Sequence, residues 1–130
     1  MTAPVWMNAV ITEFGRSAGV NGLVLNASGA AQLDFETGVS LHFEYSAGEL
    51  VIAVMAPLQG GSVEELKRIL ALTHPQARYG IKVRAGLMSK TGKSVVAVVL
   101  PERDVTLPHL NAAFTLLWRL SGATGGAPWA

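Results

Sequence analysis

The sequence predicts a single α+β domain with the element order helix, three-stranded antiparallel meander, helix, β-hairpin, helix. Runs typical of β-strands occupy residues 31–56 and 81–100, and runs with the period of amphipathic helices lie before, between and after them. At 130 residues the chain can bury one hydrophobic core but not two. We therefore predict one domain over residues 1–122, followed by a flexible, Gly-rich tail over residues 123–130.

Residues 5–18 are predicted to form an amphipathic helix. Pro4 suits the first helical turn, and Gly19 is a plausible C-terminal stop. The apolar residues of this helix share one side: Trp6, Met7, Val10, Ile11, Phe14 and Ala18. Such a stripe is either a docking surface for a peptide or, more commonly, part of the core. Residues 23–25 follow as a strand stub or as an extended lead-in to the sheet.

The stretch from Ala31 to Ala56 is predicted to form the three strands around which the chain is organised. Residues 32–36 and 39–45 alternate strictly between apolar and polar, so each strand has one buried face and one wet face. Thr37-Gly38 and Ser46-Ala47-Gly48 are short connections, which predicts consecutive hairpins. Residues 50–56 lose the alternation. They suit a central strand, or one whose outer face another chain covers.

The second half of the chain is predicted to hold two helices and a hairpin. Ser62 and Glu65 form a capping box for a helix that ends near Thr73, before His74-Pro75. Its apolar residues cover more of its circumference than one contact needs, which indicates contacts with both the sheet and a second subunit. Residues 81–87 and 94–100 form the hairpin, and a mostly buried helix of about fifteen residues begins at Thr106 and ends near Gly122.

The composition narrows the classes of partner. Half of the residues are hydrophobic and 15% are charged, whereas soluble domains average about a quarter charged. This apolar surplus is expected to lie partly at a subunit or partner interface. The net charge of +1 and the scattered Lys and Arg residues argue against nucleic acid and acidic membranes as partners. The chain has no cysteine, no apolar run long enough to span a membrane and no signal-peptide pattern, so we expect a cytoplasmic protein with no membrane insertion.

No motif predicts catalysis, a metal or a cofactor. Residues 86–94 end in the Gly-Lys-Ser of a phosphate-binding loop, but the glycine spacing is wrong and a strand follows where a helix is needed. His42, His74 and His109 lack ligand spacing. Asp34, Glu36 and Glu44 fit a solvated face better than an acid-base site. The sequence therefore predicts a non-enzymatic protein.

With these elements in place, the chain resembles the class I chaperones of bacterial type III secretion, the family of the Tir and Yop effector chaperones. The resemblance covers residues 5–122 and follows the hydrophobic pattern rather than a fixed motif. It is carried by the opening helix leading to Gly19-Val20, the meander from Ala31 to Leu58, the Leu70-Ala71-Leu72-Thr73 end of the second helix, the hairpin and the Leu-rich closing helix.

This resemblance implies a cytoplasmic bacterial homodimer that binds an N-terminal segment of a secreted effector in extended form and keeps it soluble and competent for secretion. The strand addition and groove docking that the family uses agree with general modes of peptide recognition. One departure is the near-neutral charge of this chain, because the family is usually acidic. The residues expected to contact the effector are Trp6, Val10, Phe14, Leu33, Phe35 and Leu41. The residues expected at the dimer interface are Val63, Leu66, Ile69, Leu70, Ile81 and Val83.

A dimeric interaction or regulatory module like the roadblock domains is the main alternative function. Those domains also combine short helices with five strands, but two strands precede their middle helix and three follow it. Here the prediction is three before and two after. A small enzyme or ligand-binding domain would need a polar pocket with convergent titratable groups, which the sequence does not indicate.

Overall fold

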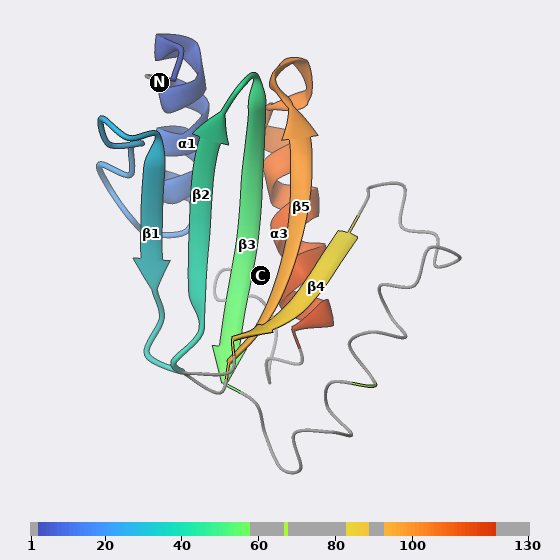
Figure 1. Ribbon diagram of the computed structural model, residues 1–130. Helices are drawn as coiled ribbons and strands as arrows, with labels where there is room; N and C mark the ends of the chain where they lie inside the picture. The colour runs from blue at the N-terminus through green and yellow to red at the C-terminus, as the bar shows by residue number, and fades with distance from the viewer. Residues whose placement is uncertain (1–2, 58–66, 68–82, 89–92, 122–130) are drawn as a thin grey trace.

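One antiparallel sheet of five strands forms the centre of the molecule, and the helices α1 and α3 lie against one of its faces (Figure 1). The structure is a computed structural model that describes residues 3–57, 67, 83–88 and 93–121. The described elements are α1 (Val5–Ser17), β1 (Ala30–Asp34), β2 (Ser40–Ser46), β3 (Glu49–Pro57), β4 (Val83–Met88), β5 (Lys93–Pro101), the short 3-10 helix η1 (Glu102–Asp104) and α3 (Leu107–Leu120). The α+β class and the predicted strands and flanking helices are thereby confirmed.

The sheet has the strand order β1-β2-β3-β5-β4, with all neighbours antiparallel. The first three strands form the predicted meander, and β4 and β5 form the predicted hairpin. The hairpin joins the meander through β5, which pairs with β3 along its whole length from Glu49↔Pro101 to Pro57↔Lys93. β3 is therefore the middle strand, which explains why its sequence is apolar on both sides.

Tight connections fix the register of the meander. In the β2–β3 hairpin, Ala47 and Gly48 have φ values of 52° and 78°, as a two-residue turn with left-handed backbone requires. The first connection is longer than predicted, because β1 ends at Asp34 and not at Glu36. The Phe35 N–H donates to the Val39 carbonyl at 2.9 Å, and Gly38 takes a φ of 86°. At this turn the Phe35 ring packs edge-on against Trp118 of α3, with 5.5 Å between ring centroids.

The core lies between the sheet and the two helices. Leu41 and Phe43 of β2, Ile52 and Val54 of β3 and Val98 of β5 are all at most 2% exposed. Aromatic rings connect the layers, because Phe14 of α1 lies 5.8 Å from Phe43 and 5.9 Å from Phe114 of α3 between ring centroids. Half of the residues of α3 are buried, fewer than the mostly buried helix that the sequence predicts. Thr106 caps this helix by accepting a hydrogen bond from the His109 N–H at 3.3 Å.

Two predicted elements lie outside the described residues. They are the second helix, residues 62–73, of which the structure describes Lys67 alone, and the tail at residues 123–130. In the described part of the chain, no helix is both long enough and apolar enough to cross a membrane.

Candidate protein-binding surfaces

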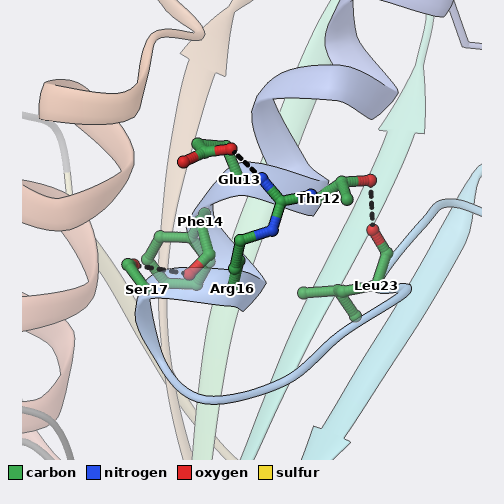
Figure 2. Close-up of polar contacts among 6 residues, drawn as sticks. All are labelled: Thr12, Glu13, Phe14, Arg16, Ser17 and Leu23. Carbon is green, nitrogen blue, oxygen red and sulfur yellow. Dashed lines mark hydrogen bonds and ion pairs between the residues drawn. The ribbon is translucent and has the colours of Figure 1, made fainter.

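The segment that follows α1 runs back along this helix and is fixed to it by hydrogen bonds. The Thr12 hydroxyl donates to the Leu23 carbonyl at 2.8 Å, as Figure 2 shows, and the Leu25 N–H donates to Asn8 Oδ1 at 2.9 Å. Gly15 allows the close approach, because a Cβ at this position would lie 2.7 Å from the Cβ of Leu23. Residues 23–25 are therefore an extended lead-in, one of the two alternatives that the sequence left open. The polar residues on this flank of α1 therefore form hydrogen bonds with the segment instead of with water.

Large apolar side chains are exposed around α1. Val5 is 87% exposed, Trp6 45% and Val24 50%, while Val10 is half-buried. Trp6 and Val10 are four residues apart and therefore share one flank of the helix. Val24 lies on the segment bound to Asn8 and Thr12, which form the other flank. The exposed apolar surface thus lies on both flanks of α1, and Val5, three residues before Asn8 and seven before Thr12, shares the second flank.

Two of the six residues predicted to contact an effector are part of the core. Phe14 is 1% exposed and Leu41 is 0% exposed. Phe14 packs between the rings of Phe43 and Phe114, which explains its burial. Leu41 pairs with Leu33 across the β1–β2 ladder and with Val54 across the β2–β3 ladder. In this structure their side chains support the fold and are covered from solvent.

The other four residues do not form one patch. Trp6 lies in the first turn of α1, which begins at the end of the sheet where β1 starts, whereas Phe35 follows the last residue of β1 at the other end (Figure 1). Leu33 and Phe35 are partly buried and pack against the core from the edge strand. The structure therefore separates an exposed α1 surface, made by Val5, Trp6 and Val10, from an edge surface at β1. Effector binding by these residues stays a prediction.

Of the six residues predicted at a dimer interface, the structure describes Val83. This residue pairs with Val98 in the sheet and packs partly buried against the core, on the helix side of the sheet. The remaining five lie outside the described residues: Val63, Leu66, Ile69, Leu70 and Ile81.

The side of the sheet opposite the helices carries a second apolar surface, which sequence reasoning did not assign as a site. We call it the outer sheet face. Its apolar centre consists of alternate residues of β3 and β5, whose neighbours along each strand point into the core. They are Val51, Ala53, Met55, Val95, Ala97 and Val99. All except Ala53 are partly exposed. The loss of alternation in residues 50–56, and a similar run in residues 95–100, were the sequence signals for this face.

Polar groups border the outer sheet face. His42 of β2 lies on it, paired with Ala53 and Gln32, and its Nε2 is 2.9 Å from the Ser40 hydroxyl. Burial lowers the pKa of His42, an effect that nearby Asp34 opposes and Lys93 reinforces. Two shallow concavities of about 320 and 300 Å³ lie on either side of His42 and share Gln32, His42 and Met55 in their linings. They form one open trough over β1, β2 and β3.

Within the described residues, the chemical motifs considered in the sequence analysis do not come together into a reactive site. In the described part of the chain, no group of three His, Asp or Glu side chains is placed to hold a metal ion. Gly86 and Lys93 belong to adjacent strands, so the Gly-Lys-Ser sequence follows a strand and starts another, as predicted. The Ser40–His42 pair has no oxyanion-hole donors among its described neighbours. The surrounding residues are in strands, and their backbone amides form the hydrogen bonds of the sheet.

Comparison with known families gives a match over almost the whole chain. The profile of the family described as "Type III secretory system chaperone SycN" matches residues 6–123. No curated protein sequence matches at a comparable level.

Solved structures with the same fold agree with this match. A chain of the ExsC–ExsE complex superposes with a TM-score of 0.69 at 21% identity, covering 96% of this chain and 100% of that one. A chain of the Yersinia pestis type III secretion chaperone SycH in complex with a fragment of YscM2 gives a TM-score of 0.67 at 21% identity, covering 92% and 99%. A chain of the HopA1–SchA chaperone–effector complex gives 0.64 at 17% identity, covering 93% and 97%. At these identities the likeness establishes the fold.

Proposed function

The chain belongs to the type III secretory system chaperone SycN family, a non-enzymatic class, and we propose that it binds an N-terminal segment of a secreted effector in extended form. In this proposal the chaperone keeps the effector soluble and competent for secretion in the bacterial cytoplasm. The observation that carries the proposal is the family match over residues 6–123. The fold likeness to a chain of a chaperone–effector complex supports a protein effector as the partner.

The exposed apolar surface around α1 supports the same function. Trp6 and Val5 are accessible without any rearrangement, and Trp side chains commonly supply much of the binding energy of protein interfaces. Leu33 lies on β1, which is an edge strand of the described sheet, and Phe35 follows its last residue, so an extended peptide that pairs along β1 can reach these side chains. We therefore retain Trp6, Val10, Leu33 and Phe35 as proposed contacts. In this proposal Phe14 and Leu41 are core residues that stabilise the fold on which the four contact residues lie.

The strand order favours the chaperone over the roadblock-like alternative. Three strands precede residues 58–82 and two follow them, whereas the roadblock arrangement has two before and three after. We further propose that the protein works as a homodimer through the predicted second helix and the β4 region, which light scattering of the purified protein tests directly.

The central experiment is to co-express the protein with each large protein that is encoded beside its gene and is a candidate for secretion, and then to purify the complex. Trp6→Asp should weaken binding of the recovered partner by roughly 30-fold, because a contact of this kind is typically worth about 2 kcal/mol. Ala112→Asp, at an exposed position on α3, is the matched control and should bind normally. Unchanged binding by a folded Trp6→Asp variant would remove the α1 surface from the proposal, and failure to recover any partner would remove the function.

The extended form of the bound segment needs its own measurement. Carbon chemical shifts of an isotope-labelled N-terminal segment of the recovered partner, in complex with the unlabelled chaperone, should report extended backbone. A segment that is helical throughout would contradict this part of the proposal.

A further inference from the structure

The loop that connects α1 to the segment running back along it contains an Asn-Gly pair, Asn21-Gly22. Figure 2 shows this loop as it leaves the end of α1 and returns to Leu23. Both residues of the pair are exposed, and a Cβ on Gly22 would meet no atom within 4 Å. Gly22 also has a φ of 78°, a left-handed conformation that Gly adopts at little cost. The pair is therefore open to solvent, with free space around Gly22.

Asn21 differs from the other three Asn residues of the chain in its neighbour and in its hydrogen bonding. Asn8, Asn26 and Asn111 are each followed by Ala. Asn8 Oδ1 accepts the Leu25 N–H at 2.9 Å, and Asn26 Oδ1 accepts two backbone N–H groups at 2.8 and 3.0 Å. Asn111 Oδ1 is buried. Among the described residues, no hydrogen bond holds the side chain of Asn21 or the backbone N–H that follows it.

These features suit an intramolecular reaction between the Asn21 side chain and the Gly22 nitrogen. Gly22 has no Cβ to hold its nitrogen away from Asn21 Cγ, and neither group has to leave a hydrogen bond first. The nitrogen forms a bond to Cγ, the Cγ–Nδ2 bond breaks, and the proton of the nitrogen leaves with the amide group as ammonia. Water then opens the resulting succinimide ring at either carbonyl carbon. We propose that Asn21 is a site of spontaneous deamidation, which yields aspartate and isoaspartate at this position.

The isoaspartate product changes how the loop is held on α1. Its main chain runs through the former side chain and is longer by one carbon atom. The loop is anchored on both sides of Asn21, because the Val20 N–H donates to the Gly15 carbonyl at 2.8 Å and the Leu23 carbonyl accepts from Thr12 at 2.8 Å. The extra atom has to fit between these two anchors. The new carboxylate also lies beyond the C-terminus of α1, where negative charge is unfavourable. Deamidation therefore loosens the segment from the helix.

Ageing of the purified, folded protein in mildly alkaline buffer at physiological temperature tests the site. Peptide mass mapping follows the replacement of NH₂ by OH at each Asn, and a protein isoaspartate methyltransferase with a labelled methyl donor detects isoaspartate. Asn21 should react at least about tenfold faster than Asn8, Asn26 or Asn111 in the same sample. A rate at Asn21 no higher than at Asn26 would overturn the proposal. The test does not depend on effector binding.

Two comparisons separate the effect of the fold from that of the Asn-Gly sequence. In the urea-unfolded chain the rate at Asn21 should lie within about tenfold of the folded rate, whereas a folded rate more than about 100-fold lower would show that the fold protects this residue. Asn21→Gln keeps an exposed amide at the same position but would have to form a larger ring. It should stop the reaction at this position, and continued methyl labelling of its peptide would contradict the assignment.

Hydrogen exchange measures the structural consequence. The Leu25 N–H donates to Asn8 Oδ1 at 2.9 Å and therefore reports whether the segment stays bound to α1. After ageing, this amide should exchange at least about tenfold faster in the isoaspartate form of the wild type than in Asn21→Gln aged in parallel. The Leu110 N–H, which donates to the Thr106 carbonyl at 2.9 Å in α3, is the control and should be unchanged. Equal exchange of the Leu25 amide in both samples would refute the loosening.

Discussion

Gly15 of α1 offers a sharp test of how the segment after this helix is held in place. Replacing Gly15 by Ala adds one methyl group in a buried position. That carbon would lie 2.7 Å from the Cβ of Leu23 and 3.1 Å from both Leu23 Cδ2 and the Val20 carbonyl oxygen. The Val20 oxygen is a backbone atom and Leu23 Cβ is bonded directly to the backbone, so rotation of a flexible side chain does not relieve these two contacts. The 18–29 segment has to move away from the helix.

Two effects of opposite sign decide the outcome. In a helix, Ala is favoured over Gly by about 1 kcal/mol. Overpacking of a buried contact costs about 1–3 kcal/mol, and moving the segment also weakens the Thr12–Leu23 hydrogen bond of 2.8 Å, worth about 1 kcal/mol. The steric and hydrogen-bonding costs exceed the helical gain. We expect the Gly15→Ala variant to lose about 1–2 kcal/mol of unfolding free energy.

Urea unfolding followed by circular dichroism measures this loss, and Gly86 of β4 provides the matched control. A Cβ at Gly86 would meet no atom within 4 Å, and its φ is not in the left-handed region. Gly86→Ala should therefore be neutral or slightly stabilising. If Gly15→Ala were as stable as Gly86→Ala, the close packing of the segment on α1 would be refuted.

Two further predictions follow from the sheet. Ala47 is the non-glycine residue with positive φ (52°) in the described part of the chain, and Ala47→Asn should raise the unfolding free energy by about 1 kcal/mol, because Asn-Gly is the preferred sequence for this hairpin turn. A loss of stability in urea would contradict the turn geometry. His42 has its pKa lowered from 6.5 by burial, with Asp34 of β1 opposing the shift and Lys93 of β5 adding to it. The unfolded chain therefore binds the proton more tightly, so stability should fall as the pH decreases below about 6.5. His42→Gln should flatten this dependence between pH 7.5 and 5.5, and an unchanged slope would assign it to other groups.

The individual strands and helices of this protein can be predicted from the sequence because the patterns that predict them lie within short stretches of the chain. Alternation over residues 39–45 predicts β2, since successive side chains of a strand point to opposite faces. The Ser46-Ala47-Gly48 turn predicts its hairpin with β3, and Thr106 predicts the start of α3. The α+β class and the element order needed no information about long-range contacts.

The tertiary structure decided which of these elements touch and which apolar residues stay exposed. Nothing in residues 93–101 alone distinguishes β5 from β4 as the neighbour of β3, because that pairing joins segments about 45 residues apart. The helical stripe of α1 contains both Trp6, which is 45% exposed, and Phe14, which is 1% exposed. Periodicity assigns both to the same side of the helix, and the contacts of Phe14 with Phe43 and Phe114 determine which one is buried.

The sequence by itself determined α1, α3, the five described strands and the turn at Ala47-Gly48, together with an apolar surplus that indicates a protein partner. The tertiary structure alone placed that surplus on the exposed end of α1 and on the outer face of β3 and β5. The physical reason is that the periodicity of the sequence indicates which side chains avoid water, whereas the packing between distant segments determines which other residues cover those side chains.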